Sequence, residues 1–130
     1  MSKPKEKCLF CNKKKQNIIY STKFIYVVRD SFPVTKYHSL IIPHRHISNF
    51  FYLNNDELKD LSKILKKERQ SLLDLDKEIK AFNVGVNAGE DSGQSIMHFH
   101  IHLIPRRKGD IKNPRGGVRG VIPSKQKYIK

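Results

Sequence analysis

The run HFHIHLIP at residues 98–105, in which histidine alternates with apolar residues, constrains the fold more than any other part of the sequence. In a β-strand, side chains two residues apart point to the same face of the sheet. A strand here would bury the apolar residues and gather three histidines, His98, His100 and His102, on the other face. Half of the chain's six histidines fall in this run. Because imidazole binds metals and, when protonated, anions, the cluster predicts a functional site.

The loop before this run, residues 87–95, is polar and contains Gly89 and Gly93. Glycine permits positive φ angles and a close approach of the backbone to a ligand, as a phosphate-binding loop requires. Asn87, Gln94 and Ser95 add amide and hydroxyl groups that can donate hydrogen bonds beside the histidines. An ordinary hairpin loop would have a similar composition, but the neighbouring histidines favour a phosphate-binding role.

The alternating run resembles the signature of the HIT (histidine triad) family, His-φ-His-φ-His-φ-φ with φ apolar. Its flanks, Gly93-Gln94-Ser95 and Pro105-Arg106, are similar to those of the family. The resemblance implies an α+β, HIT-like fold with a mainly antiparallel sheet, one long helix and short helical segments. It also implies a homodimer that acts on nucleotides. The C-terminal residues resemble a bacterial and archaeal branch of dinucleoside polyphosphate (diadenosine tetraphosphate) hydrolases.

This resemblance implies nucleotidyl transfer to water through a covalent intermediate. His100 would attack the α-phosphorus of a nucleotide, and water would then release a nucleoside monophosphate. His102 and His38 would donate to the phosphoryl oxygens or to the leaving group. Asp30 would bind the ribose hydroxyls, although Tyr37 stands where the family usually has glycine before His38. The further substrate-binding residues implied are Asn87, Gln94 and Ser95, with Val28 in the base pocket.

Two substrate classes are compatible with this chemistry: dinucleoside polyphosphates, the preferred class, and nucleoside phosphoramidates or other adenylylated compounds. A nucleotide- or nucleic-acid-binding module with little turnover is a third alternative, since the formal net charge is +14. A basic surface attracts anionic ligands, but a lysine-rich proteome would produce the same excess. Binding a phosphate needs no nucleophile, so the presence of His100 argues against a purely binding role. Nucleic acid is therefore not the favoured partner.

Both cysteines of the chain, Cys8 and Cys11, belong to one Cys-x-x-Cys pair. Taken alone, the pair is compatible with a redox motif, half of a metal site or two unrelated thiols. No βαβ pattern follows, as a redox motif would require, and a tetrahedral zinc site needs two more ligands. Many HIT proteins bind structural zinc through such a pair, a mid-chain histidine and the first triad histidine, which correspond to His46 and His98. His44 is an alternative to His46.

Four further strands are predicted from the rest of the sequence. Residues 17–29 contain two β-branched and aromatic runs around a polar turn, which indicates a hairpin. Residues 38–43 form another strand, which its proline would end. Residues 81–87 alternate as a strand that would pair with residues 98–105. The prediction is therefore an α+β arrangement of antiparallel strands with one long helix.

The longest helix is predicted to begin near Asn54, because asparagine caps helices and acidic residues favour the first turn. Leucine and isoleucine then recur at the spacing of one buried stripe. The predicted members of this stripe are Leu58, Leu61, Leu65, Leu72, Leu75 and Ile79. The charged residues on the other faces are expected to be solvated; they are Lys63, Lys66, Lys67, Glu68 and Arg69.

The 130 residues are the length of one domain, so residues 1–130 are predicted to form a single HIT domain. Residues 1–7 would be a flexible tail. Residues 108–130, rich in glycine and arginine, would form an arm without regular structure that contacts substrate or a partner subunit. No apolar run reaches the ~20 residues of a membrane span, and no apolar signal region follows the basic start. A cytoplasmic protein without membrane contact is expected.

Overall fold

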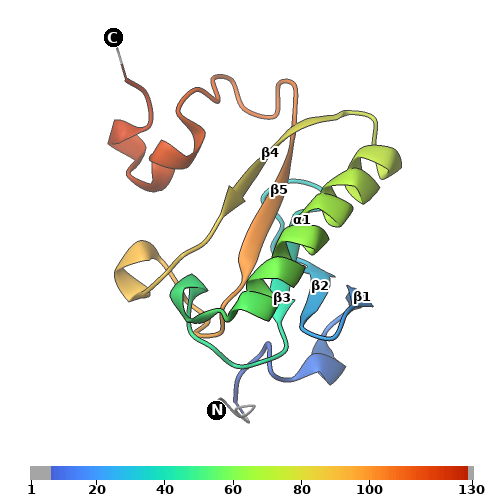
Figure 1. The fold of residues 1–130 in the computed structure, drawn as a ribbon. Helices are drawn as coiled ribbons and strands as arrows, with labels where there is room; N and C mark the ends of the chain where they lie inside the picture. The colour runs from blue at the N-terminus through green and yellow to red at the C-terminus, as the bar shows by residue number, and fades with distance from the viewer. Residues whose placement is uncertain (1–6, 129–130) are drawn as a thin grey trace.

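The computed structural model describes residues 7–128, and its centre is an antiparallel five-stranded sheet (Figure 1). The strands are β1 (Ile18–Ser21), β2 (Ile25–Arg29), β3 (Ser39–Pro43), β4 (Ile79–Gly85) and β5 (Ile101–Arg107). They lie in the order β1-β2-β3-β5-β4. One long helix, α1 (Asn55–Leu75), crosses the sheet. The predicted α+β fold is confirmed.

Short helical segments accompany these elements, as the family resemblance implied. They are 3₁₀ turns at Lys13–Lys15, Phe50–Tyr52 and Glu90–Ser92, and two more lie in the C-terminal arm, at Gly117–Val121 and Pro123–Lys125. Apart from Lys7, the tail predicted at residues 1–7 lies outside the described residues. No helix in the described part of the chain has both the length and the apolar composition needed to cross a membrane.

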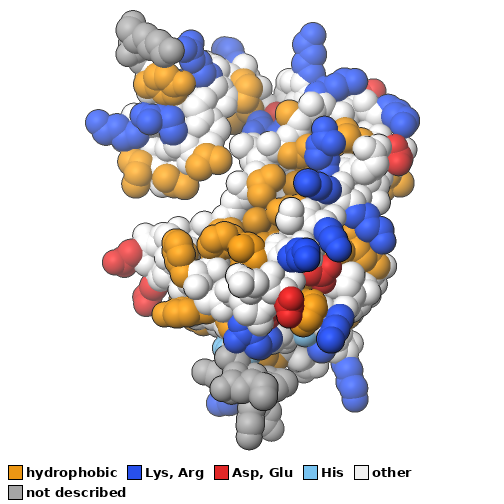
Figure 2. All heavy atoms as spheres, viewed as in Figure 1, with side chains coloured by type: hydrophobic (Ala, Val, Ile, Leu, Met, Phe, Trp, Pro, Cys, Tyr) orange, Lys and Arg blue, Asp and Glu red, His pale blue; other side chains and the backbone are white. Residues whose placement is uncertain are grey.

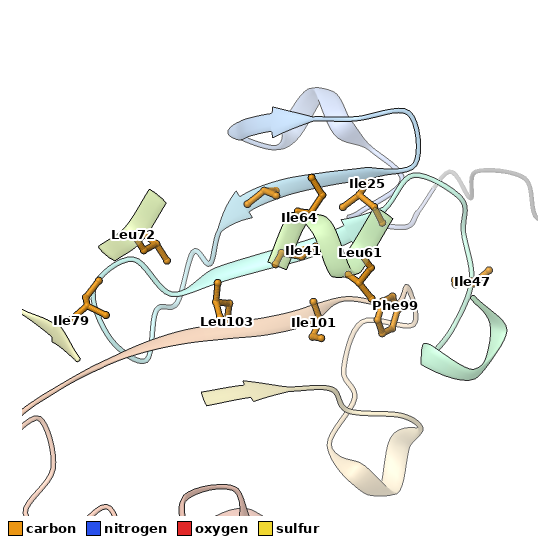
Figure 3. Close-up of a cluster of buried hydrophobic side chains, with 11 residues drawn as sticks. Ile25, Ile41, Ile47, Leu61, Ile64, Leu72, Ile79, Phe99, Ile101 and Leu103 are labelled. Atoms are coloured by element: carbon orange, nitrogen blue, oxygen red, sulfur yellow. The ribbon is translucent and has the colours of Figure 1, made fainter. Parts of the chain in front are cut away.

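The two central strands, β2 and β3, are buried on both faces. One face packs against α1 and forms the main core, in which Ile25, Ile41, Ile101 and Leu103 meet the helix (Figure 3). Each such side chain contributes roughly 1.5–3 kcal/mol through the burial of apolar surface. The opposite face carries a smaller apolar cluster made of Phe10, Tyr26, Val28, Leu40 and Ile42. This second face is the one that carries the candidate site.

Helix α1 begins as predicted, because the Asn54 side chain and Glu57 form a reciprocal capping box. Leu61 and Leu72 are buried, as predicted. The prediction was wrong for Leu58 and Leu75, which lie near the two ends of the helix and are 43% and 57% exposed. It was also wrong for two other positions. Ile79 belongs to β4 rather than to the helix, and Glu68 is buried instead of solvated.

Residues 108–128 form an arm that leaves β5 and lies beside β4, on the side of the sheet edge (Figure 1). It contains no strand and no α-helix in its described part, but it does contain two 3₁₀ segments that the sequence did not predict. Arg119 lies 4.8 Å from the ring centroid of Tyr128, and the Gln126 amide donates to the carbonyl of Arg115. Figure 2 shows the hollow between this arm and the rest of the chain, and lysine and arginine side chains over α1.

Candidate functional site

The predicted strand at residues 98–105 is only partly present, because β5 begins at Ile101. His98 and His100 therefore precede the regular strand, and the prediction that all three imidazoles share one sheet face was wrong for His98. Its side chain is fully buried at the end of the sheet. His102 lies within β5, opposite Leu40 of β3, and Leu40 in turn lies opposite Val28 of β2. His102 thus shares a face with the smaller apolar cluster.

His98 faces Cys8, Cys11 and His46, and the four residues form a group that could hold a metal ion. The Nδ1 atom of His98 lies 3.4 Å from each cysteine Sγ and 3.2 Å from Nδ1 of His46. The Sγ atom of Cys11 lies 3.1 Å from Nδ1 of His46. Ligands of a tetrahedral zinc ion stand about 3.3–3.7 Å apart, so only small adjustments separate this group from a zinc site.

The backbone fixes the orientation of the His98 ring. Its Nε2–H donates to the carbonyl of Pro43 at 2.8 Å, so the neutral ring directs the Nδ1 lone pair at the cysteines. Such a bond to the far nitrogen is typical of histidine ligands. Burial lowers the pKa of His98 to about 4, which favours the neutral form that a metal needs. His44, the alternative ligand, instead contacts Ser21 and the carbonyl of Thr22.

Phe10 connects this group to the next histidine. The residue lies between the two cysteines and is buried, and its ring is edge-on to both His98 and His100, at centroid distances of 6.0 and 5.0 Å. The Cys-x-x-Cys segment therefore supplies both potential ligands and a wall of the histidine cluster. No feature of the sequence indicated this second role.

A single hydrogen bond fixes the tautomer of His100. Its Nδ1 lies 2.8 Å from the carbonyl oxygen of His98. A carbonyl can only accept, so Nδ1 carries the proton and Nε2 presents its lone pair. Burial lowers the pKa of His100 below the ordinary value, although Asp30 and the bond to the His98 carbonyl oppose this change. The ring is therefore neutral near pH 7 and has one nucleophilic nitrogen.

His38 and His102 form a hydrogen-bonded pair beside His100. Nε2 of His38 lies 2.9 Å from Nδ1 of His102, and the rings of His100 and His102 have centroids 5.2 Å apart. Asp30 completes the group, with its Oδ2 atom 3.5 Å from Nε2 of His38. The structure therefore brings together Asp30, His38, His100 and His102. Desolvation lowers the pKa of both paired imidazoles, to about 4 for His102.

The turn between β2 and β3 positions this pair. Asp30 donates its backbone N–H to the carbonyl of His38 at 2.9 Å, and its Oδ1 accepts from the N–H of Phe32 at 2.8 Å. Tyr37, at the position where glycine was expected, has φ = 74°. A bulky residue in this left-handed region is strained by about 1–2 kcal/mol. The turn thus keeps the backbone conformation that glycine would adopt. His38 comes directly after Tyr37, and its side chain is only 2% exposed.

Asp30, His38 and His102 also present three ligand atoms within 4.8 Å of one another. The hydrogen bonds argue against a metal there. The backbone N–H of Val34 donates to Nδ1 of His38 at 3.0 Å, so this nitrogen must accept. The proton of the neutral ring is then on Nε2, the atom that a metal would need. Among the described residues, the cysteine-containing group is therefore the better metal site.

Each of the three predicted loop residues has a different environment. Gln94 is buried, and its amide bonds the N–H of Gly89 and the carbonyls of Ser48 and Ile96. It therefore holds the loop together. Asn87 lines a groove of about 500 Å³ together with both members of the His38–His102 pair. Ser95, the last residue of the loop, is exposed.

Groove residues come from both the sheet and the C-terminal arm. Arg106 contributes a guanidinium, which donates to Asn83 at 2.7 Å and pairs with Asp110 at 2.8 Å. The hydrogen bonds that Arg106 donates to the Asp110 carboxylate raise the pKa of Arg106, so the guanidinium stays protonated. The arm provides the facing wall with Pro114, Gly117, Val118, Gly120, Val121 and Gln126. The groove therefore contains one guanidinium, which is paired with Asp110, on the strand that also carries His102.

The family model of the HIT domain matches residues 12–109 of the chain, which include the whole sheet, α1 and the histidine cluster. The chain belongs to the HIT family.

Several HIT relatives are similar in sequence. Protein hit of Bacillus subtilis is 34% identical over 110 residues, which are 81% of this chain and 75% of that protein. The nitrilase and fragile histidine triad fusion protein NitFhit of Caenorhabditis elegans is 36% identical over 94 residues, and the match spans only 21% of its length and 72% of this chain. The asymmetrical bis(5′-nucleosyl)-tetraphosphatase of Schizosaccharomyces pombe is 33% identical over 93 residues, 72% of this chain and 50% of the relative.

Solved HIT structures share the fold. A HIT family protein from Bacillus anthracis superposes with a TM-score of 0.74 and 28% identity, over 81% of this chain and 77% of that one. A Zn-bound histidine triad family protein from Mycobacterium smegmatis gives a TM-score of 0.74 over 82% of this chain and 80% of that one. Its identity is 22%, so this second likeness concerns the fold alone.

Within this HIT chain, sequence reasoning missed the backbone groups that set the histidine tautomers. These are the carbonyls of Pro43 and His98 and the N–H of Val34. No side-chain pattern carries such information, because every residue has a carbonyl and nearly every residue has an N–H. Arg106 could have been found, since it was recognised as part of the family's flank but was given no role.

Proposed function

We propose that this HIT protein is a nucleotidyl hydrolase that cleaves at the α-phosphate of a nucleotide and releases a nucleoside monophosphate. The observation that carries the proposal is the hydrogen bond from Nδ1–H of His100 to the His98 carbonyl. It leaves the Nε2 lone pair of a neutral imidazole available for attack. A histidine that only bound phosphate would gain from being charged, whereas burial lowers the pKa of this one.

The reaction would proceed in two displacements. In the first, Nε2 of His100 forms a bond to the α-phosphorus, and the bond from phosphorus to the leaving group breaks. In the second, water attacks the same phosphorus and gives up a proton to solvent, the P–N bond breaks, and its electron pair returns to Nε2. Dividing one difficult displacement in this way is the advantage of covalent catalysis. The His98 carbonyl accepts the Nδ1–H throughout and stabilises the positive charge of the substituted ring.

The neighbouring residues would bind the rest of the nucleotide. His102 and Asn87 line the groove next to His100 and can donate to phosphoryl oxygens. Asp30 would accept from the ribose hydroxyls through Oδ2, because Oδ1 already accepts from the N–H of Phe32. Val28 shares the sheet face of His102 and would contribute to an apolar base pocket.

The loop at residues 87–95 would bind the phosphate chain in two ways. Gln94, predicted as a direct ligand, has its amide occupied within the loop, so we assign it to holding the backbone of Gly89 in position. Ser95, which is exposed, would donate directly. His38 is almost completely buried, so it would act through His102 and not on the substrate itself.

We assign structural zinc to Cys8, Cys11, His46 and His98, whose ligand atoms lie close together at tetrahedral-like separations. In such closed four-ligand sites zinc cross-links distant segments of the chain and takes no part in catalysis. Its effect here would be to fix the His98 backbone, whose carbonyl orients His100. The Zn-bound protein from Mycobacterium smegmatis, which has the same fold, is compatible with this assignment.

Dinucleoside polyphosphates are the preferred substrate class, and nucleoside phosphoramidates are the alternative. The name of the Schizosaccharomyces pombe relative supports the first class. We also propose a single domain that assembles as a homodimer, because β4 is an edge strand with Val84 46% exposed, and an edge strand offers unpaired backbone groups to a second chain. Nucleic-acid binding without turnover is less favoured, since it needs no oriented nucleophile.

The test is product analysis with diadenosine tetraphosphate for the wild type, His100→Ala and His44→Ala. We expect the wild type and His44→Ala to release AMP, because His44 contacts Ser21 and Thr22 outside the cluster. We expect His100→Ala to lose at least about a thousandfold in rate, as nucleophile variants do. Turnover by His100→Ala at the wild-type rate would refute the proposed mechanism.

A further inference from the structure

The outer face of α1 carries a row of basic side chains that the proposed reaction does not use. We propose that this row binds the phosphate backbone of a nucleic acid, independently of base sequence. Helix α1 packs on one face of the sheet, and His102 lies on the other face with the smaller apolar cluster. The contact is therefore separate from the histidine cluster, and it adds to the proposed function without replacing it.

The basic row runs along the side of α1 that faces away from the sheet. Its members are all exposed; they are Lys59, Lys63, Lys66, Lys67 and Arg69. Lys59, Lys63 and Lys66 are separated by four and three residues, so they lie one above another on the helix surface. Lys67 and Arg69 flank this line on either side. Figure 2 shows lysine and arginine side chains over α1.

The acidic side chains of α1 do not neutralise this row. Glu57 and Glu68 are buried, and each is paired with an arginine of another segment. Asp60 is half-buried and accepts a hydrogen bond from the hydroxyl of Thr22 at 2.5 Å. The two exposed acids, Asp56 and Asp74, lie near the ends of the helix. Every exposed charge of α1 between those two positions is therefore positive.

The basic row is also without ion-pair partners. In the part of the chain that the structure describes, none of its five members forms a salt bridge. Lysines four residues apart on a helix repel each other, and α1 contains two such pairs, Lys59–Lys63 and Lys63–Lys67. A high lysine content explains the number of charges but not the withdrawal of the acids from this one face. The arrangement predicts an anionic partner, whose binding would replace repulsion by attraction.

The linear shape of the row favours a linear polyanion. Lys59 and Lys66 are seven residues apart, which corresponds to about 10 Å along the helix axis. One strand of a nucleic acid presents about three phosphates in that length, so three lysines match three phosphates. A helix that binds a membrane surface inserts its apolar face, whereas the apolar face of α1 is buried against the sheet. The backbone of a nucleic acid is therefore the favoured partner.

A lysine outside the helix extends the row at its N-terminal half. Lys23, in the turn before β2, lines a hollow of about 240 Å³ together with Lys59 and Lys63. Asp56 and Asp60 also line this hollow, but the carboxylate of Asp60 is already bonded to Thr22. A phosphate bound there would be contacted from two elements of the fold.

The test is fluorescence anisotropy with a labelled DNA duplex of about 20 base pairs, at salt concentrations from about 50 to about 200 mM. Each phosphate contact contributes about −0.9 to the slope of log K against log salt concentration, so five contacts predict a slope of about −4.5. The triple variant Lys59→Ala, Lys63→Ala, Lys66→Ala should flatten this slope by about 2.7. It should also weaken binding at least about tenfold.

The matched control is the triple variant Lys13→Ala, Lys14→Ala, Lys15→Ala. It removes the same charge from an exposed segment close to Phe10, which packs on the opposite face of the sheet. We expect it to change binding by less than about twofold, and the circular dichroism spectra of both triple variants to match that of the wild type. His100→Ala should bind the duplex as tightly as the wild type, so failure of the proposed reaction would leave this result unaffected.

Three results would overturn the proposal. The first is the absence of saturable duplex binding by the wild type at about 50 mM salt. The second is an equal loss of binding in the two triple variants, which would show that net charge alone, and not the row on α1, is responsible. The third is binding of vesicles that contain phosphatidylserine without binding of the duplex, which would assign the row to an anionic membrane instead.

Discussion

The buried acid Glu68 offers a sharp test of how α1 is attached to the sheet. Its carboxylate accepts a hydrogen bond from Arg29 of β2 and lies 3.0 Å from the hydroxyl of Ser39 of β3. The side chain of Glu68 is 1% exposed, whereas that of Arg29 is 27% exposed. Glu68→Ala would remove the anion and leave a partly buried guanidinium without its partner.

The size of the effect follows from these exposures. Removing one partner of a buried ion pair costs about 3–5 kcal/mol. Because Arg29 retains access to water at 27% exposure, it can recover part of its hydration, so we expect a loss near the lower limit, about 3 kcal/mol. Glu68→Gln keeps the shape and one acceptor oxygen but loses the charge. We expect it to cost about 1.5–2 kcal/mol, the value of a charge-assisted hydrogen bond.

Urea-induced unfolding monitored by circular dichroism measures both values. The matched control is Glu90→Gln, since Glu90 is an exposed acid in a 3₁₀ segment, and its stability should change by less than about 0.5 kcal/mol. If Glu68 is a buried anion, the loss in the free energy of unfolding should be largest for Glu68→Ala, smaller for Glu68→Gln and smallest for the Glu90→Gln control. If Glu68→Ala lowered the free energy of unfolding by less than about 1 kcal/mol, the carboxylate would not anchor the helix to the sheet.

Further predictions concern the metal site, the ribose site, the loss of folding stability at acid pH and the packing of the core. Elemental analysis of the wild type should give about one equivalent of zinc per chain, and the Cys8→Ala, Cys11→Ala double variant should lose it; full retention of zinc by the double variant would exclude the assigned ligands. Asp30→Ala should weaken AMP binding about tenfold in calorimetry without a change in the circular dichroism spectrum, and unchanged affinity would remove Asp30 from the ribose site. Burial raises the pKa of Glu57, but hydrogen bonds from Arg45 and from the N–H of Asn54 outweigh it, so the folded pKa lies below the ordinary value. The ionised carboxylate therefore stabilises the fold above pH ~4.3, the pKa of an unfolded chain, and this stabilisation is lost as the pH falls through the lower pKa of the folded state. Urea unfolding at a series of pH values from about pH 6 to about pH 3 should show a weaker pH dependence of stability for Glu57→Gln than for the wild type. Leu72→Ala, at a fully buried position of α1, should lower the free energy of unfolding by about 3 kcal/mol, and a loss below about 1 kcal/mol would contradict close packing there.

Local patterns were sufficient to predict the elements of the fold. Alternation identified the strands, and the Asn54 cap identified the start of α1. They were insufficient for His98, because period-two alternation assumes that the strand extends to both ends of the pattern. Contacts with Cys8, Cys11 and His46, all distant in sequence, accompany the departure of His98 from the face of His102. Contacts between distant segments are not contained in a local pattern.

Glu68 shows a different kind of failure, since the helical pattern did contain the answer. Glu68 lies seven residues after Leu61 and four before Leu72, which is the spacing of the buried stripe itself. Its charge was taken as a sign of solvation, because unpaired acids are rarely buried. The partner that permits burial, Arg29, belongs to a strand 39 residues earlier. Periodicity therefore predicted the correct face, and residue type alone predicted the wrong environment.

Helix α1 fixes both halves of the candidate site through two such pairs. Glu57 and Glu68 are eleven residues apart, about three turns, so both lie on the buried face. Glu57 binds Arg45, the residue directly before the metal-ligand candidate His46, and Glu68 binds Arg29, the residue directly before Asp30. Each arginine ties the backbone beside a site residue to the same rigid helix. Each half of the candidate site is therefore attached to α1 by its own ion pair, and a one-residue insertion between the two acids would rotate one of them by about 100° relative to the other and break one of the two attachments.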